Sequence, residues 1–186
     1  GAQWIGKGCE RLDLSGAPAH DEFAAVFSNI HPQSGERLRN PKDTSADEQG
    51  ANRERGGFET VLNADKSLSV LYAASDDETK AVIATSVRAA SENAFQYAVD
   101  EGFFQIRYGK GGHDRQATDQ VTAAMFVHEC SRNKDPQLHV HLEVAGSVAG
   151  FDGNWHSLDA REFFQRQREL AYVFDAYLHS ELVERG

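Results

Sequence analysis

His128, His139 and His141 are three of the chain's eight histidines, and they lie close together in the sequence. His139 and His141 alternate with apolar residues across 138–144, the pattern of a half-buried strand, so both project from one face. Two histidines on the wet face of a strand often bind nothing. A third imidazole on that face would complete a site for a divalent metal ion, with coordination positions left for water or substrate.

A hairpin would bring His128 to the other two histidines. Residues 121–127 have the composition of a strand, and 131–135 form a polar turn that Pro136 closes. If this strand pairs with the next one, His128 lies opposite the His-x-His pair. The spacing therefore predicts one metal site formed by three histidines.

The residues around the histidines carry a specific family pattern. From Phe126 to His141 the sequence reads F-x-H-x-x-S-R-x-x-D-P-Q-L-H-x-H. This pattern resembles the metal-binding segment of the conjugative relaxases of the MobF class, which belong to the HUH superfamily of single-strand DNA nucleases. The resemblance implies that the three histidines bind one divalent ion, with Mg, Mn, Zn and Ni as candidates. It also implies nicking of one plasmid DNA strand at an origin of transfer, with covalent transfer of that strand to a recipient.

Two further segments extend the resemblance over nearly the whole chain. Residues 4–16 read W-x-G-x-G-x-x-x-L-x-L-x-G, as near the start of the relaxase domain. A lone G-x-G without a preceding strand is weak evidence for a phosphate loop, so we expect a tight turn there. The second segment, residues 59–69, is similar to the family's D-L-T-F-S-A-P-K-S-V-S and retains Lys66, Ser67 and Ser69. It departs from the pattern at Asn63 and Asp65.

The resemblance assigns roles to three more residues. Glu59 stands where the family has an aspartate close to the nucleophile and the histidines, so it is a candidate catalytic residue that accepts a proton or orients a histidine. The alternative is a surface carboxylate whose extra methylene misplaces it. Lys66 and Arg132 are candidate phosphate contacts along bound single-stranded DNA.

The family's nucleophilic tyrosine is the missing part. In relaxases it precedes the Trp-x-Gly-x-Gly stretch, and here only three residues precede Trp4. The chain's tyrosines match no nucleophile position; they are Tyr72, Tyr97, Tyr108, Tyr172 and Tyr177. We therefore expect a tyrosine upstream of the chain, and a fragment of a larger protein that does not cleave DNA by itself.

Composition limits the other possibilities. A chain of 186 residues with 40% hydrophobic residues is expected to form one domain, 1–186, with a sizeable core. Two cysteines are too few for a disulfide scaffold and predict a cytoplasmic, reducing compartment, and no apolar run has the length of a membrane span. The net charge of −10 opposes DNA binding unless the charge is segregated. We expect such a segregated basic cluster around the histidine hairpin, formed by Arg107, Lys110, Arg115, Arg132 and Lys134.

Hydrophobic periodicity predicts an α+β domain, in which helices flank a central antiparallel sheet, as in HUH relaxases. Helices are expected at 21–30, 75–100 and 159–184, strands at 58–62, 103–108, 121–127 and 138–144, a helix or strand at 67–72, a surface loop at 31–57, and turns at 109–112 and 151–155. A capping box, with Ser75 at the N-cap and Glu78 three residues later, opens the second helix.

Three functions of different classes remain open. The first is a truncated relaxase that acts on single-stranded DNA at the origin of transfer, with accessory conjugation proteins as further partners and no membrane partner. The second is a relaxase-like module that binds single-stranded DNA without cutting it, which the missing tyrosine favours. The third, an unrelated metal enzyme such as a cupin, is disfavoured because the third histidine precedes the His-x-His pair.

Overall fold

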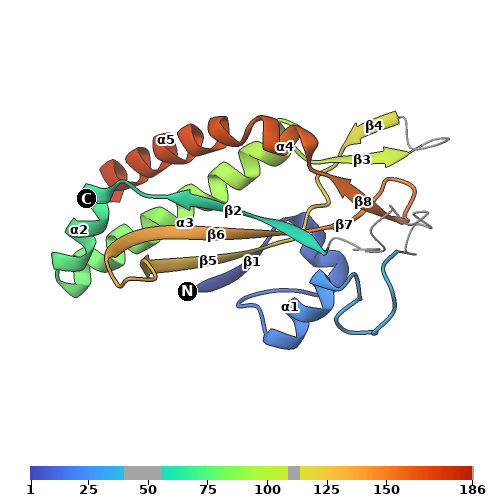
Figure 1. Cartoon of the computed structure of the whole chain (residues 1–186), viewed down its shortest axis with the longest axis horizontal. Coiled ribbons are helices and arrows are strands. Elements are labelled where there is room, and N and C mark those ends of the chain that lie inside the picture. The colour runs from blue at the N-terminus through green and yellow to red at the C-terminus, as the bar shows by residue number, and fades with distance from the viewer. Residues whose placement is uncertain (40–55, 109–113, 186) are drawn as a thin grey trace.

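The computed structural model describes residues 1–39, 56–108 and 114–185. Within these residues, a four-stranded main sheet has the order β1 (Ala2–Ile5), β5 (Ala123–Cys130), β6 (Pro136–Ala145) and β2 (Gly57–Asn63). Neighbouring strands are antiparallel, and β5 and β6 form the predicted hairpin at the centre (Figure 1). The predicted α+β class with an antiparallel sheet is confirmed.

The alternating sequence of β6 decides which face of the main sheet is buried. Leu138, Val140 and Leu142 are at most 1% exposed and belong to the larger hydrophobic core. His139 and His141 lie between them and point to the opposite face, where they are partly exposed. Because a slip of one residue would bury the polar set, the core fixes the register that presents the histidines.

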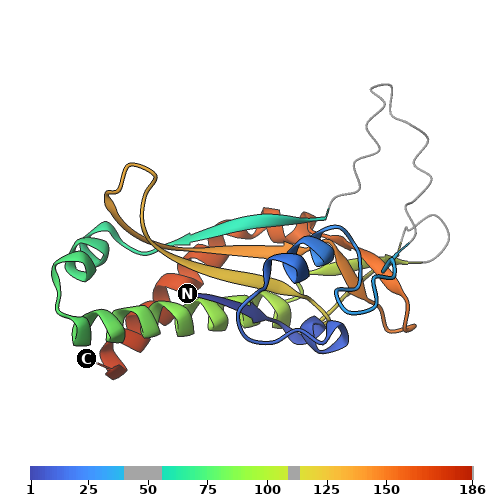
Figure 2. The same ribbon diagram turned by 90° about the horizontal axis from the view of Figure 1, so that it is seen from below.

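Helices cover both faces of the main sheet, but unequally. On the apolar face lie α2 (Lys66–Ala74), α3 (Asp77–Asp100), α4 (Arg161–Gln165) and α5 (Gln167–Arg185). On the histidine face lie α1 (His20–Phe27) and the 3₁₀ helix Lys7–Leu12 (Figures 1 and 2). A smaller core forms under α1 and reaches along β5 to Phe126, so the strand ends beyond it are left open.

A second four-stranded sheet lies at the other end of the molecule from the β5–β6 turn (Figure 1). Its order is β4 (Asp114–Ala117), β3 (Gln105–Tyr108), β8 (Trp155–Asp159) and β7 (Ser147–Ala149). Of these, the sequence predicts only β3. The other strands give no period-two signal, because β7 has three residues, all buried, and β4 has four residues, all exposed.

Two helix boundaries differ from the predicted ones. The N-cap of α3 is Asp76, whose carboxylate accepts the Thr79 amide at 2.9 Å, while the Ser75 hydroxyl instead donates to the Leu71 carbonyl in α2. The predicted final helix from Asp159 is interrupted at Arg166, and Asp159 itself ends β8. The Arg166 guanidinium covers the Phe103 ring at 3.9 Å from its centroid and pairs with Glu169 at 2.6 Å.

The N-terminal glycines serve packing. The predicted tight turn is instead β1 followed by the 3₁₀ helix. Gly6 has φ +93°, and a Cβ there would lie 2.3 Å from the carbonyl oxygen of Val121, so only glycine allows this approach to the segment that precedes β5. The predicted surface loop at 31–57 and turn at 109–112 fall largely outside the described residues. Among the described helices, none is both long and apolar enough to cross a membrane.

Candidate metal centre

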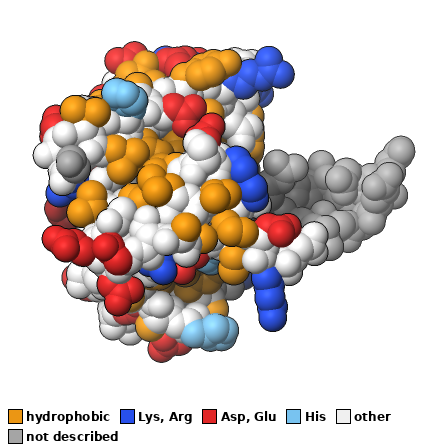
Figure 3. Space-filling model, turned by 90° about the vertical axis from the view of Figure 1, so that its left-hand side faces the viewer, with side chains coloured by type: hydrophobic (Ala, Val, Ile, Leu, Met, Phe, Trp, Pro, Cys, Tyr) orange, Lys and Arg blue, Asp and Glu red, His pale blue; other side chains and the backbone are white. Residues whose placement is uncertain are grey.

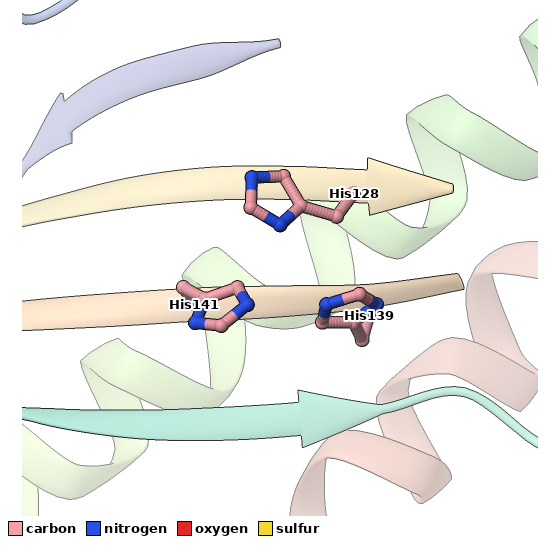
Figure 4. Close-up of side chains that lie close together, drawn as sticks. All are labelled: His128, His139 and His141. Carbon is pink, nitrogen blue, oxygen red and sulfur yellow. The ribbon is translucent and has the colours of Figure 1, made fainter. Parts of the chain in front are cut away.

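The three histidines converge on the open end of the histidine face (Figure 4). His128 pairs directly with His139 across the β5–β6 hairpin, and His141 lies two residues further along the same face. The ring centroids are 5.2 Å apart for His128 and His139, 4.7 Å for His128 and His141, and 4.9 Å for His139 and His141. One nitrogen from each ring lies within 4.8 Å of the others, so a single ion could be reached by all three.

Hydrogen bonds select the nitrogen that two of these rings present. Nδ1 of His139 lies 2.9 Å from the carbonyl oxygen of Gln137, and Nδ1 of His141 contacts the carboxylate of Glu59. Both partners can only accept, so each Nδ1 carries the proton and each Nε2 keeps a free lone pair. This arrangement is typical of metal-binding histidines, whose second nitrogen is held by a carbonyl or a carboxylate. The donor set therefore fits a divalent transition metal.

Strand pairing places Glu59 beside His141. In the β2–β6 ladder, His141 pairs with Val61, and Glu59 lies two residues away on the same face of β2. Such diagonal neighbours are within reach of long side chains. Glu59 also pairs directly with Glu143, whose carboxyl has a raised pKa because of burial and the nearby Glu59 charge.

The environment of His128 favours its neutral form. Partial burial lowers the pKa of His128, and the neighbouring rings of His141 and His139 lower it further. A neutral imidazole is the form that binds a metal. His128 is exposed and the other two rings are half-buried, so the cluster is open to solvent on one side.

Comparison with known proteins identifies the family. The family model described as TrwC relaxase matches residues 1–186. The chain belongs to the TrwC relaxase family. The relaxase resemblance inferred from the sequence is therefore confirmed, and with it the HUH relaxase fold.

Relatives of this relaxase-family chain act in conjugation. It is 31% identical over 163 residues to the multifunctional conjugation protein TraI of Escherichia coli, covering 86% of this chain and 8% of that protein. The copper-bound conjugative relaxase TrwC in complex with oriT DNA superposes with a TM-score of 0.84 at 29% identity, over 100% of this chain and 60% of that one. A metal-free TrwC–oriT complex gives 0.84 at 28%, over 100% and 62%. The chain thus spans less than two thirds of these relatives.

The two predicted DNA contacts lie near each other at the end of the hairpin. Arg132 is exposed in the β5–β6 turn. Lys66 is the first residue of α2, and its Nζ donates to the Pro136 carbonyl oxygen at 2.7 Å. An ammonium has three hydrogens, so this bond leaves capacity for a phosphate. Contact with DNA stays a prediction for both residues.

The predicted basic cluster around the hairpin is wrong for two of its members. Arg107 and Arg115 lie on β3 and β4 of the second sheet and pair with Asp159 at 2.7 and 3.3 Å. Both arginines are close to the hairpin in sequence but not in space, because β3 and β4 belong to a different sheet from β5. Lys110 lies outside the described residues. On the face seen in Figure 3, Lys and Arg are scattered among acidic side chains rather than gathered in one patch.

The tyrosines of this relaxase-family chain lie away from the open histidine face. Tyr72 and Tyr97 donate to Glu129 and Glu169, each at 2.7 Å. Tyr108 contacts Phe151 edge to face beside the second sheet, with ring centroids 5.6 Å apart. The remaining two, Tyr172 and Tyr177, belong to α5.

Two further groups lie beside the cluster. The alternation in the sequence places Glu143 on the same strand face as His139 and His141, and the structure adds that it pairs directly with Glu59. The Gln137 carbonyl that orients His139 is a backbone group, for which the side-chain pattern carries no signal.

Proposed function

We propose that this chain is the metal- and DNA-binding part of a conjugative relaxase, which nicks one DNA strand at an origin of transfer. The observation that carries the proposal is the convergence of three imidazoles, two of which have Nδ1 held by acceptors. In this proposal His128, His139 and His141 hold one divalent ion. When bound, that ion polarises the scissile phosphate and stabilises the charge that develops on it.

The donor set indicates the class of ion, a divalent metal, and not one particular element. Three imidazole nitrogens suit the divalent transition metals, including Mn, Ni and Zn, and Mg serves as a Lewis acid where it is abundant. The existence of copper-bound and metal-bound structures of the relaxase TrwC supports a metal ion in this proposal.

Glu59 acts in this proposal through its contact with His141. Its carboxylate fixes the tautomer and orientation of that ring, and its second oxygen is available to accept a proton from an attacking hydroxyl. The same position in the family pattern is an aspartate. Lys66 and Arg132 bind phosphates of the single strand next to the hairpin end, which compensates locally for the net charge of −10.

The nucleophile in this proposal is a tyrosine that precedes residue 1 of the chain. The amide of Val127 donates to the Gly1 carbonyl at 2.9 Å, so β1 begins beside the residue that precedes His128. A segment that continued β1 upstream in the same direction would run along β5 toward His128, which supports this proposal. The tyrosine oxygen would attack phosphorus and the bond from phosphorus to the 3′ oxygen would break, leaving a 5′-phosphotyrosine and a 3′-OH that receives the displaced proton.

A second candidate function is a single-stranded DNA-binding module that does not cleave. The placement of all five tyrosines away from the open histidine face favours it for the chain as it stands. In either case we propose that residues 1–186 form one relaxase-like domain of a longer, cytoplasmic protein, with accessory conjugation proteins as further partners.

Denaturing gel electrophoresis separates the two functions. The 186-residue chain and a version that carries its natural upstream segment are incubated with single-stranded origin DNA, with Mn²⁺ or with a chelator. The relaxase proposal predicts a slow covalent protein–DNA band from the longer version with metal, and none from the shorter chain. A longer version that contains tyrosine and metal but forms no adduct, while it still binds the DNA, would favour the non-cleaving module.

A further inference from the structure

One face of α2 is tied to the strands that carry the histidines. Lys66, Ser69 and Tyr72 are three residues apart and so lie along one side of the helix. Figures 1 and 2 both show α2 beside the β5–β6 turn. Each of the three forms one hydrogen bond to the hairpin: Lys66 with the carbonyl of Pro136, Ser69 with the amide of Leu138, and Tyr72 with the carboxylate of Glu129.

The Ser69 hydroxyl takes the place of a backbone carbonyl acceptor at the point where β2 leaves the sheet. The β2–β6 ladder ends where Asn63 pairs with His139, after which the Ala64 amide donates to the Leu138 carbonyl at 3.0 Å. In a regular antiparallel ladder the Ala64 carbonyl would accept the Leu138 amide in return. Here the chain turns into α2, and the Ser69 hydroxyl accepts that amide at 2.9 Å.

This hydrogen bond is buried and adjoins the metal centre. Ser69 is 1% exposed and Leu138 is 0% exposed, so no water can replace the bond. Leu138 stands between His139 and Gln137, the residue whose carbonyl holds Nδ1 of His139. Ser69 therefore fixes the backbone segment that both carries and orients one of the three imidazoles.

Tyr72 anchors the other strand at an irregular point. From His128 to Cys130 strand β5 advances by two residues, whereas its partners on β6, His139 to Pro136, advance by three, so Glu129 lies opposite an irregularity in β6. Bulges break the ladder and re-aim neighbouring side chains. Tyr72 is 8% exposed, and its hydroxyl donates to Glu129 at 2.7 Å. Burial and the Glu129 carboxylate raise the pKa of Tyr72 to about 12, which keeps the hydroxyl protonated as a donor.

We infer that Ser69 and Tyr72 are positioning residues for the metal centre: they hold the two hairpin strands so that His128 and His139 keep the spacing that one ion requires. The inference rests on the proposed metal site and adds to it a second layer of residues on the opposite face of the sheet. Neither residue touches the metal or the DNA in this account.

The test compares Ser69→Ala and Tyr72→Phe with matched controls. Ser91→Ala removes another buried helical hydroxyl, which bonds the Val87 carbonyl at 2.8 Å, and Tyr97→Phe removes another Tyr–Glu bond of 2.7 Å. Each protein is titrated with Co²⁺ while its visible absorption spectrum is recorded, and its thermal unfolding is measured alongside. We expect the two positioning variants to bind Co²⁺ about 10- to 100-fold more weakly with an altered spectrum, as for other residues that orient ligands.

The controls separate a positioning role from a general loss of stability. Ser91→Ala and Tyr97→Phe should lower the melting temperature comparably but keep the wild-type affinity and spectrum. Wild-type affinity and spectrum in both positioning variants would overturn the inference alone. A wild-type protein that binds no Co²⁺ would overturn the proposed metal centre and the positioning role together.

Discussion

The carboxylate of Glu59, on β2, contacts Nδ1 of His141, on the neighbouring strand β6. This contact joins the residue that the family pattern marks as catalytic to one of the three imidazoles. It orients the ring and leaves its Nε2 as the nitrogen that is free to bind a metal ion.

Replacing the carboxylate should weaken the metal centre. Glu59→Gln keeps the size of the side chain but removes its charge, so we expect about a tenfold loss of metal affinity, as is common for partners of ligating histidines. Isothermal titration calorimetry with Mn²⁺ measures this loss. Glu78→Gln, on the surface of α3, is the control and should bind as the wild type does. Unchanged affinity in Glu59→Gln would show that the contact does not tune the centre.

Arg132 should contribute to DNA binding in a salt-dependent way. If it contacts one phosphate, Arg132→Ala lowers affinity for single-stranded DNA and reduces the slope of log K against log salt by about 0.7. Fluorescence anisotropy at several salt concentrations measures both quantities. Arg185→Ala, at the C-terminal end of α5 where Arg185 pairs with Glu181, should leave the slope unchanged. Equal slopes for wild type and Arg132→Ala would remove this residue from the interface.

The aromatic core under α4 should dominate stability. Phe163 is 1% exposed and contacts the rings of Phe58, Phe103, Phe104 and Phe164. Phe163→Ala should lower the free energy of unfolding by about 3–5 kcal/mol through lost burial and a residual cavity. Tyr172→Ala, at a site that is 72% exposed, should change it by less than about 0.5 kcal/mol. Urea denaturation distinguishes these values.

Acid should weaken the hydrogen bonds around Glu169. The guanidinium of Arg166 and the hydroxyl of Tyr97 lower the pKa of this carboxyl from 4.5 to about 2. A lowered pKa stabilises the folded state above the unfolded pKa, and that contribution is lost as pH falls from about 4.5 toward 2. The stability difference between wild type and Glu169→Gln should therefore shrink over this window. A difference that stays constant from pH 6 to pH 2.5 would contradict the assignment.

Cys9 and Cys130 should differ sharply in reactivity. Burial raises the pKa of Cys9 to about 11, whereas Cys130 is exposed. At pH 8 the Cys9 thiol is protonated and shielded, so brief iodoacetamide treatment should label Cys130 alone. Peptide mass spectrometry reads the labelled positions. Comparable labelling of both cysteines in the folded protein would mean that the first strand and its 3₁₀ helix are not packed as described.

The histidine hairpin was predictable because one simple pattern determines it. Alternation along β6 fixes which residues share a face, and a short polar turn fixes the partner strand, so His128, His139 and His141 could be brought together from sequence alone. The 3.6-residue periodicities of α1 and α3 were equally direct.

Other features depend on contacts that local patterns do not encode. The second sheet consists of short strands with no period-two signal, so Arg107 and Arg115 were assigned to the wrong surroundings. The break at Arg166 depends on Phe103 and Glu169 as partners of its guanidinium. The positioning role that we infer for Ser69 depends on the point at which β2 leaves the sheet, and no residue type in the sequence indicates that point.

The central claim, that three histidines bind one divalent ion, is tested most directly by calorimetric titration of the wild type and of a variant that combines His139→Ala and His141→Ala. We predict one ion bound per chain in the wild type and loss of that binding in the variant. Circular dichroism should show that both proteins are folded. Equal affinity and stoichiometry in the two proteins would contradict it.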